Sequence, residues 1–227
     1  MITPAPLELG TPWNKVHELL VPALGQTAVM VGVVMVIVVS LGMPLGLLIF
    51  NTSPRGLVPN RGVNLSISWI ANLGRSLPFL VLMAAIIPFT RLVVGTTIGI
   101  QAAIIPMSLA GIAFFARLTE NAVREIPSEL LDVGLASGGS KWQIVRSVQL
   151  VEALPGLAAA LTLNTIAMIE YSAIAGAIGA GGLGYLAVNY GYQQFDDNIM
   201  ISCIVLLVAL VQIIQFTGDR VVRVLQH

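Results

Sequence analysis

The sequence predicts an all-α integral membrane protein, a single domain over residues 1–227 with five transmembrane helices. Two features of the composition predict this class: 56% of the residues are hydrophobic and 10% are charged, where soluble domains carry roughly 25% charged residues. The mean hydropathy is +0.90. In addition, long stretches of the chain lack Asp, Glu, Lys and Arg, and a bilayer core of about 30 Å requires about 20 apolar helical residues.

Five charge-poor stretches define the expected spans. The first runs without a charge from Leu19 to Pro54 and is too long for a cleaved signal peptide. The second contains Arg75 between two uncharged stretches, so we expect one helix there, and the fourth continues past Glu170. The expected spans are residues 20–50, 65–90, 92–117, 153–175 and 197–218.

The basic residues predict the orientation of these spans, because Lys and Arg concentrate in short cytoplasmic loops. Nine of the 11 lie in segments that share one side of the membrane when five spans are threaded through it: Arg55, Arg61, Arg75, Arg117, Arg124, Lys141, Arg146, Arg220 and Arg223. Only Lys15 and Arg91 fall on the other side. The N-terminus is therefore expected outside and the C-terminus in the cytoplasm.

Several classes of function are disfavoured by the composition. A formal net charge of zero gives no basic surface for nucleic acid. Cys203 is the single cysteine, which excludes an intrachain disulfide. His17 and His227 lie at opposite ends, so neither a histidine-based metal site nor a Ser/His nucleophile pair is expected. We expect no metal site, no catalytic residue and no enzymatic activity in this chain.

The expected cytoplasmic segment, residues 118–152, has the start and stop signals of two short helices. Ser128 is positioned to cap the first, and Gly138 with the next glycine would end it. Ser140 and Gln143 have the spacing of a capping box for the second. The alternative is an amphipathic connector resting on lipid headgroups; a DNA-binding helix-turn-helix is disfavoured because membrane spans tether both ends.

Residues Glu129 to Gly156 resemble the cytoplasmic EAA loop of binding-protein-dependent ABC import permeases. With the family's glycine on Gly138, its Glu-Ala-Ala triplet falls on Asp132, Val133 and Gly134, and Val151 stands where the family has proline. The resemblance implies a coupling helix that fits a groove on an ATPase. The residues it assigns to ATPase coupling are Glu129, Asp132, Val133, Gly134, Gly138 and Gly139.

The resemblance extends from Leu65 to the C-terminus and is specific to methionine-import permeases. It rests on Arg75–Phe79, Ile87–Thr90, Gly95–Gly99 and Tyr171–Ala173, among other segments. It implies a multi-pass permease of the bacterial cytoplasmic (inner) membrane that moves methionine or a close analogue. The implied partners are a second copy of the chain, two cytoplasmic ATPase subunits and an extracytoplasmic substrate-binding protein.

The chain itself carries no Gly-x-x-x-x-Gly-Lys-Ser/Thr loop. We therefore expect no cofactor on this chain, and ATP and Mg on the partner ATPase.

A glycine-rich segment, Gly176 to Gly184, fits Gly-x-Gly-x-x-Gly, but no strand precedes it, which is wrong for a dinucleotide-binding turn. Five glycines in nine residues disfavour a regular helix. Two interpretations remain open: a tight helix-packing surface of small residues, or a flexible element near the external mouth that includes Gly181 and Gly182.

Glu170 is the one carboxylate deep in an apolar stretch, and a charge there costs about 2.5 to 3.5 kcal/mol on insertion scales. It should face protein or water, either with a partner such as Arg75 or in a transport role. The alternative function is a secondary transporter or channel that uses Glu170 as an ion or proton site. Candidate residues of a translocation path or gate are Asn164, Glu170, Tyr171, Ser172, Gly181 and Gly182.

Overall fold

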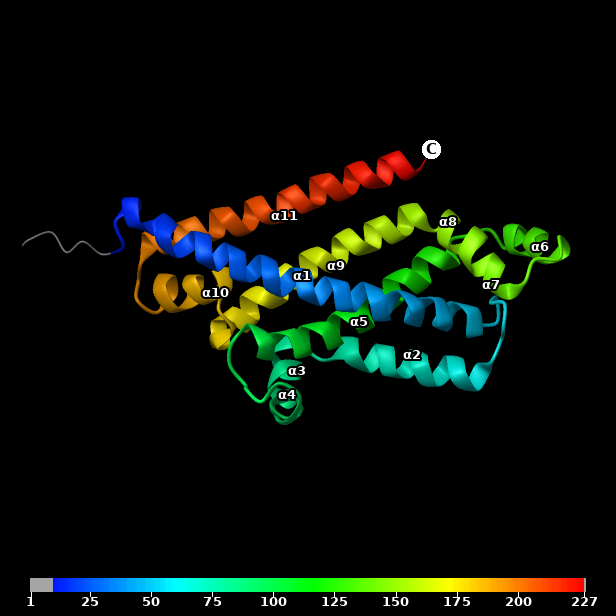
Figure 1. The fold of residues 1–227 in the computed structure, drawn as a ribbon, viewed down its shortest axis with the longest axis horizontal. Helices are drawn as coiled ribbons and strands as arrows, with labels where there is room; N and C mark the ends of the chain where they lie inside the picture. Colours follow the sequence, from blue (N-terminus) through cyan, green and yellow to red (C-terminus); the bar gives the residue numbers. More distant parts are fainter. Residues whose placement is uncertain (1–9, 227) are drawn as a thin grey trace, which may run out of the picture. The chain divides into compact units, whose positions relative to one another are not determined.

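The computed structural model describes residues 10–226, and within this range the chain is helical with no strand (Figure 1). The chain divides into two compact units. Unit 1 comprises the described residues up to Val33 together with Phe79–Met107 and Met168–Ile213. Unit 2 comprises Val34–Pro78, Ser108–Ala167 and the described residues from Ile214 onward.

The helices follow one another with short connections. Eleven are α-helical: α1 (Trp13–Thr52), α2 (Arg61–Ser76), α3 (Phe79–Ala85), α4 (Ile87–Val94), α5 (Ile100–Arg124), α6 (Ser128–Ala136), α7 (Lys141–Ile144), α8 (Leu150–Glu152), α9 (Leu154–Ala175), α10 (Gly182–Tyr185) and α11 (Asp197–Leu225). Three short π-helical segments lie among them: η1 (Val145–Gln149), η2 (Gly176–Ala180) and η3 (Leu186–Tyr192).

Four described helices are long and apolar enough to cross a membrane: α1, α5, α9 with its extension to Ala180, and α11. The pair α2 and α3 becomes a fifth candidate if the two are counted as one broken span. The prediction of a single helix over residues 65–90 is wrong. Leu77 is extended, with ψ of 130°, because Pro78 disfavours the helical conformation in the residue before it.

The range expected for the third span, residues 92–117, is not one helix either. Helix α4 ends at Val94, and Gly95 and Gly99 both have positive φ, 81° and 92°. Helix α5 then begins at Ile100 and continues to Arg124. Left-handed glycines end helices, and the continuation past Arg117 is favoured because Glu120 pairs with the arginines on either side of it.

Unit 2 has a core in which both short helices of the segment after α5 take part. Leu131 of α6 and Ile144 of α7 are buried against residues of α1, α5 and α9. The buried members of this cluster are Phe50, Ala122, Val123, Ile126, Leu131, Ile144, Ala153 and Leu157. The two short helices are therefore fixed to the ends of three long helices of the same unit.

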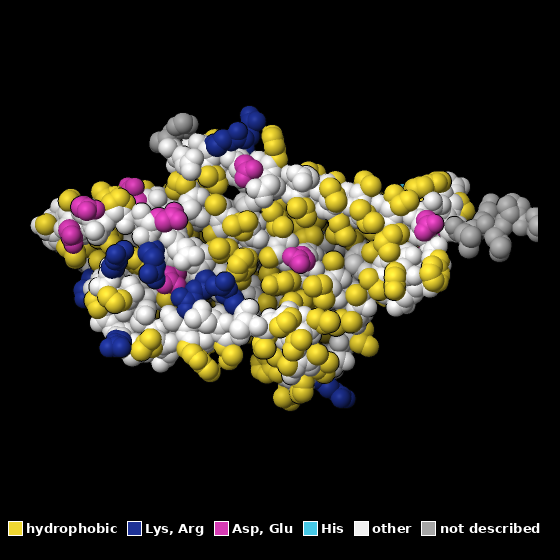
Figure 2. All heavy atoms as spheres, turned by 180° about the vertical axis from the view of Figure 1, so that it is seen from behind, with side chains coloured by type: hydrophobic (Ala, Val, Ile, Leu, Met, Phe, Trp, Pro, Cys, Tyr) yellow, Lys and Arg dark blue, Asp and Glu magenta, His cyan; other side chains and the backbone are white. Residues whose placement is uncertain are grey.

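Unit 1 has its own core, in which α10 and η3 pack between α1 and α11. Its buried members are Ala23, Leu183, Leu186, Ile199 and Cys203. Outside the cores, large apolar side chains are widely exposed, and Figure 2 shows them over much of the face in view. In the most apolar window of α11, only 11% is buried. Exposed apolar surface of this extent suits helices that meet lipid or another protein.

Candidate functional site

The helices α6 and α7 form a short hairpin, and Figure 1 shows them side by side. Pro127 precedes α6 with φ of −55° and ψ of 131°, and no side chain caps the helix. Ser128 is therefore the first helical residue, and the prediction that it is the cap is wrong. A proline holding this extended geometry starts the helix without a capping hydroxyl.

The hairpin turn depends on two glycines. Gly138 has φ of +79°, a left-handed conformation that favours glycine. The backbone N–H of Gly139 donates to the carbonyl oxygen of Gly134 at 3.1 Å. The capping box predicted for the second helix is present: Gln143 N donates to Ser140 Oγ at 3.3 Å, and Ser140 N donates to Gln143 Oε1 at 2.8 Å.

The hairpin has a buried side and an exposed side. On the buried side, a Cβ added to Gly134 would lie 3.3 Å from Cγ1 of Ile144, so the two helices are in close contact there. On the exposed side, Val133 is 62% and Trp142 is 71% accessible. The carboxylates Glu129 and Asp132 are exposed as well. Exposed apolar and charged side chains on one short hairpin are compatible with a protein-docking surface.

A reciprocal amide pair joins the end of α1 to the π-helical segment η1. Asn51 Nδ2 donates to Gln149 Oε1 at 2.8 Å, and Gln149 Nε2 donates to Asn51 Oδ1 at 2.9 Å. Gln149 is fully buried and Asn51 is 9% accessible. Removing one partner would leave the other amide unpaired and buried, at a cost of about 1–3 kcal/mol.

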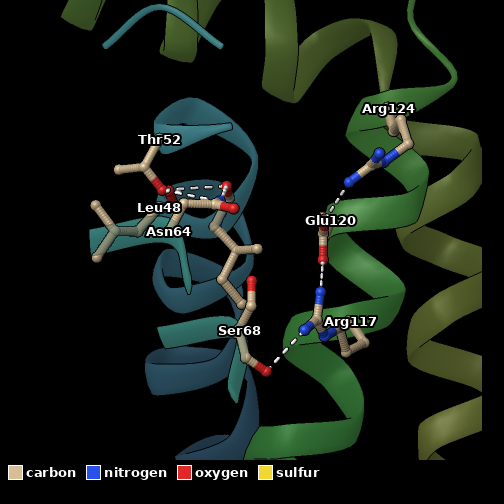
Figure 3. Close-up of polar contacts among 8 residues, drawn as sticks. Leu48, Thr52, Asn64, Ser68, Arg117, Glu120 and Arg124 are labelled. Carbon is tan, nitrogen blue, oxygen red and sulfur yellow. Dashed lines mark hydrogen bonds and ion pairs between the residues drawn. The ribbon is translucent and has the colours of Figure 1, made fainter. Parts of the chain in front are cut away.

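A buried carboxylate joins α5 to α2 through its arginine neighbour. Glu120, 3% accessible, forms salt bridges with Arg117 at 2.5 Å and with Arg124. Arg117 also donates through Nη2 to the carbonyl oxygen of Ser68 on α2, at 2.8 Å (Figure 3). In the same view, Asn64 of α2 donates to the hydroxyl of Thr52 on α1. The three helices are thus linked by directional contacts within unit 2.

The residues predicted for a path or gate are spread over both units. In unit 2, Asn164 is fully buried, and its Nδ2 lies 3.3 Å from the sulfur of Met35. In unit 1, the Tyr171 ring stacks on Phe79 with centroids 4.3 Å apart, and Ser172 bonds the carbonyl of Ile169 in its own helix.

Glu170 is exposed in unit 1 and takes part in none of the salt bridges found among residues 10–226. Arg75, considered above as its partner, instead lies over the ring of Phe114 in unit 2, 5.9 Å from the centroid.

Gly181 and Gly182 lie at a tight turn of unit 1 that is fastened to α1. Both have positive φ, 86° and 78°. The Gly182 N–H donates to Gln26 Oε1 at 2.8 Å, and the next N–H, of Leu183, donates to Thr27 Oγ1 at 3.0 Å. The glycine-rich segment is therefore both broken and closely packed. A pocket of about 560 Å³ lies beside it, lined in part by Gln26 and Tyr185.

Sequence reasoning missed the two polar clusters of unit 2. The Arg117, Glu120 and Arg124 cluster has a local signal, since these residues are three and four positions apart on one helix. The pair of Asn51 and Gln149 has none, because 98 residues separate its members. Among the residues that the structure describes, no group of three or more His, Cys, Asp or Glu side chains is arranged to hold a metal ion.

The fold is that of a multi-span membrane protein with a short helical hairpin, α6–α7, between two of its long helices. Residues 41–227 match the sequence model of the family described as binding-protein-dependent transport system inner membrane component. The chain therefore belongs to this family and is an inner-membrane protein.

Individual relatives agree with this assignment. The probable D-methionine transport system permease protein MetI of Vibrio cholerae is 44% identical over 210 residues, which cover 92% of this chain and 93% of the relative. The D-methionine transport system permease protein MetI of Escherichia coli K12 is 44% identical over 183 residues, 81% of this chain and 84% of that protein.

Solved structures show the same fold. A chain of the MetNI methionine ABC transporter in an inward-facing conformation matches with a TM-score of 0.90 and 44% identity, covering 92% of this chain and 97% of that one. An amino acid ABC transporter matches with a TM-score of 0.70 at 17% identity over 93% of this chain and 94% of that one, which supports the fold alone.

Proposed function

We propose that this chain is the permease subunit of an ATP-driven ABC importer that moves methionine or a close analogue into the cytoplasm. The observation that carries the proposal is 44% identity to the probable D-methionine transport system permease protein MetI of Vibrio cholerae over 92% of the chain. The match in fold to the MetNI methionine transporter over the same share of the chain supports it. A single subunit of four or five spans is small for enclosing a solute path, which favours a symmetric dimer with the path on its axis.

The α6–α7 hairpin is the dock for a cytoplasmic ATPase in this proposal. Its exposed Val133 and Trp142 supply apolar contact area, and Glu129 and Asp132 supply charge at the rim. In this proposal the hairpin, with Lys141 and Arg146, lies in the cytoplasm and the N-terminus outside, and the distribution of basic residues supports this orientation. Two ATPase subunits bind ATP and Mg²⁺, and a substrate-binding protein delivers the solute from the outer side.

Reconstitution tests this function directly. Proteoliposomes containing the chain, its ATPase and its binding protein are given labelled methionine on the binding-protein side and ATP on the ATPase side. We expect uptake that requires ATP hydrolysis and continues when a protonophore collapses the proton gradient. A matched preparation with a non-hydrolysable ATP analogue is the control.

Two other outcomes have different meanings. Uptake that proceeds without ATP and stops with the protonophore would replace this function by secondary transport through Glu170. ATP-driven uptake of another solute, with methionine ignored, would refute the substrate and leave the importer in place.

A further inference from the structure

We propose that the amide pair of Asn51 and Gln149 transmits movement of the α6–α7 hairpin to the end of α1. Through this contact, ATP hydrolysis is coupled to transport. The inference rests on the proposed function, because it assigns a positioning role within an ATP-driven importer. Neither residue touches the solute in this proposal. Each acts through the helix that carries it.

The geometry of the pair sets it apart from the contacts around it. The buried cluster that holds Leu131 and Ile144 is apolar, and apolar contacts are non-directional, so such surfaces tolerate sliding. Two antiparallel hydrogen bonds of 2.8 and 2.9 Å fix both the distance and the orientation of the two side chains. The pair therefore sets the register between α1 and the segment that follows α7.

The position of Gln149 supports a mechanical role. It ends the π-helical segment η1, where the N–H of Leu150 donates to the carbonyl of Val145 five residues earlier. Single-turn π segments inside helices are frequent at functional sites. This segment follows α7 directly, so a displacement of the hairpin reaches Gln149 within five residues.

The position of Asn51 distributes that displacement further. Its own Nδ2 also donates to the carbonyl of Leu47, which holds the side chain against α1. Its backbone carbonyl accepts from Val58 N at 2.9 Å, and Asn64 of α2 donates to the neighbouring carbonyl of Ile49 at 2.7 Å. A displacement of Asn51 is therefore transmitted both to α1 and to the start of α2.

The test separates coupling from stability by comparing two double variants. Asn51→Leu with Gln149→Met replaces both amides by apolar groups of similar volume, so that neither amide is left buried without the other. The Leu57 N–H loses only a long contact of 3.5 Å to Asn51 Oδ1. Asn51→Gln with Gln149→Asn exchanges the two amides and conserves their combined length. The measurement is the number of methionine molecules imported per ATP hydrolysed, in the reconstituted transporter, together with the thermal unfolding midpoint.

We expect the apolar double variant to keep its ATPase partner and its unfolding midpoint while the import ratio falls about tenfold. The exchanged pair restores most of the ratio. Thr162→Val is the matched control, since the hydroxyl it removes is buried and, among residues 10–226, donates to the carbonyl of Ala158 in its own helix. Its import ratio should stay at the wild-type value. An apolar double variant that imports with the wild-type ratio would overturn the proposal.

A second measurement does not depend on how the apolar variant folds. Asn51→Cys and Gln149→Cys are introduced with Cys203→Ala, because Cys203 is the single cysteine of the chain. A short bifunctional thiol reagent then replaces the hydrogen bonds by a covalent bridge. If the two residues move as one, the bridged transporter imports with a higher ratio than the unbridged one. If the bridge stops import, residues 51 and 149 must separate during transport, and the proposal is refuted.

Absence of ATP-dependent import by the wild-type chain would refute the proposed function instead, so the two failures are distinguishable.

Discussion

In each unit an irregular segment is held against α1, but the contacts that hold it differ in kind between the two units. In unit 1, the turn at Gly181 and Gly182 presents backbone N–H groups to Gln26 and Thr27, and the close approach depends on the missing side chains. In unit 2, η1 is fastened by two side-chain amides and the hairpin by apolar side chains. The first arrangement depends on backbone geometry that few residues adopt, whereas the second depends on side-chain chemistry that conservative exchanges can reproduce.

The largest expected effect tests the backbone side of this comparison. A Cβ on Gly176 would lie 2.6 Å from the backbone nitrogen of Tyr185 and 2.7 Å from the carbonyl oxygen of Gly181. Because backbone atoms cannot rotate aside, Gly176→Val should cost about 3 kcal/mol, the upper end for overpacking. Thermal unfolding in detergent measures the loss.

Gly32→Ala is the matched control in unit 1, since nothing lies within 4 Å of the added Cβ. It should be neutral or stabilising by up to about 1 kcal/mol. Equal losses in Gly176→Val and Gly32→Ala would remove the distinction drawn for unit 1.

An intermediate effect is expected for the side-chain chemistry of unit 2. Glu120→Gln would leave Arg117 and Arg124 without their carboxylate. Breaking a buried pair costs about 3–5 kcal/mol, but the Arg124 side chain is 51% accessible, so we expect about 2 kcal/mol. Asp219→Asn, which alters an exposed hydrogen bond to Gln215, is the control and should change stability by less than about 0.5 kcal/mol. A Glu120→Gln protein as stable as the control would mean that the cluster of Arg117, Glu120 and Arg124 does not contribute to stability.

The smallest expected effect concerns Asp196, which is an exception to the comparison. Its carboxylate holds parts of unit 1 together through hydrogen bonds. Thr11 donates to Asp196 through its backbone N at 2.7 Å and its hydroxyl at 2.6 Å, and Ile199 N donates at 3.1 Å. Burial alone raises the pKa of the Asp196 carboxyl, but these hydrogen bonds outweigh it and hold the pKa below its usual 3.8.

A depressed pKa in the folded state gives stability that is present above the unfolded value and lost as the pH falls through the folded one. Wild type should therefore exceed Asp196→Asn by about 1 kcal/mol near neutral pH. The difference should close below the ordinary pKa of 3.8. Unfolding midpoints of the two proteins, compared across this pH range, measure it. A gap that persists unchanged in acid would show that the charge of Asp196 is irrelevant.

Local chemistry made much of the fold predictable from the sequence. The charge-free stretches identify α1 and α11, and the Ser140 and Gln143 spacing gives the start of α7, because capping depends on residues three positions apart. The break at Leu77 and Pro78 had a local signal too. The prediction joined the uncharged stretches on either side of Arg75 into one helix over residues 65–90 and was wrong.

The tertiary contacts of the site were not predictable in the same way. An asparagine and a glutamine 98 residues apart pair only because two helix ends meet, and no spacing rule reports that. The same holds for Gln26 and Thr27, which bond residues 156 positions away. Glu120 was assigned to a polar loop because the helix was expected to end at residue 117. Its two arginine partners extend α5 past that point.

The separation between Asn51 and Gln149 also has a consequence for synthesis. Gln149 is 98 positions after Asn51, and at about 5 to 20 residues per second a ribosome needs about 5 to 20 seconds to add them. Through that interval the Asn51 amide has no Gln149 to pair with, and of the bonds from its Nδ2 only that to the carbonyl of Leu47 in its own helix can form. The nascent protein therefore completes this joint only after α5 and the α6–α7 hairpin have been made, and any earlier arrest leaves it open.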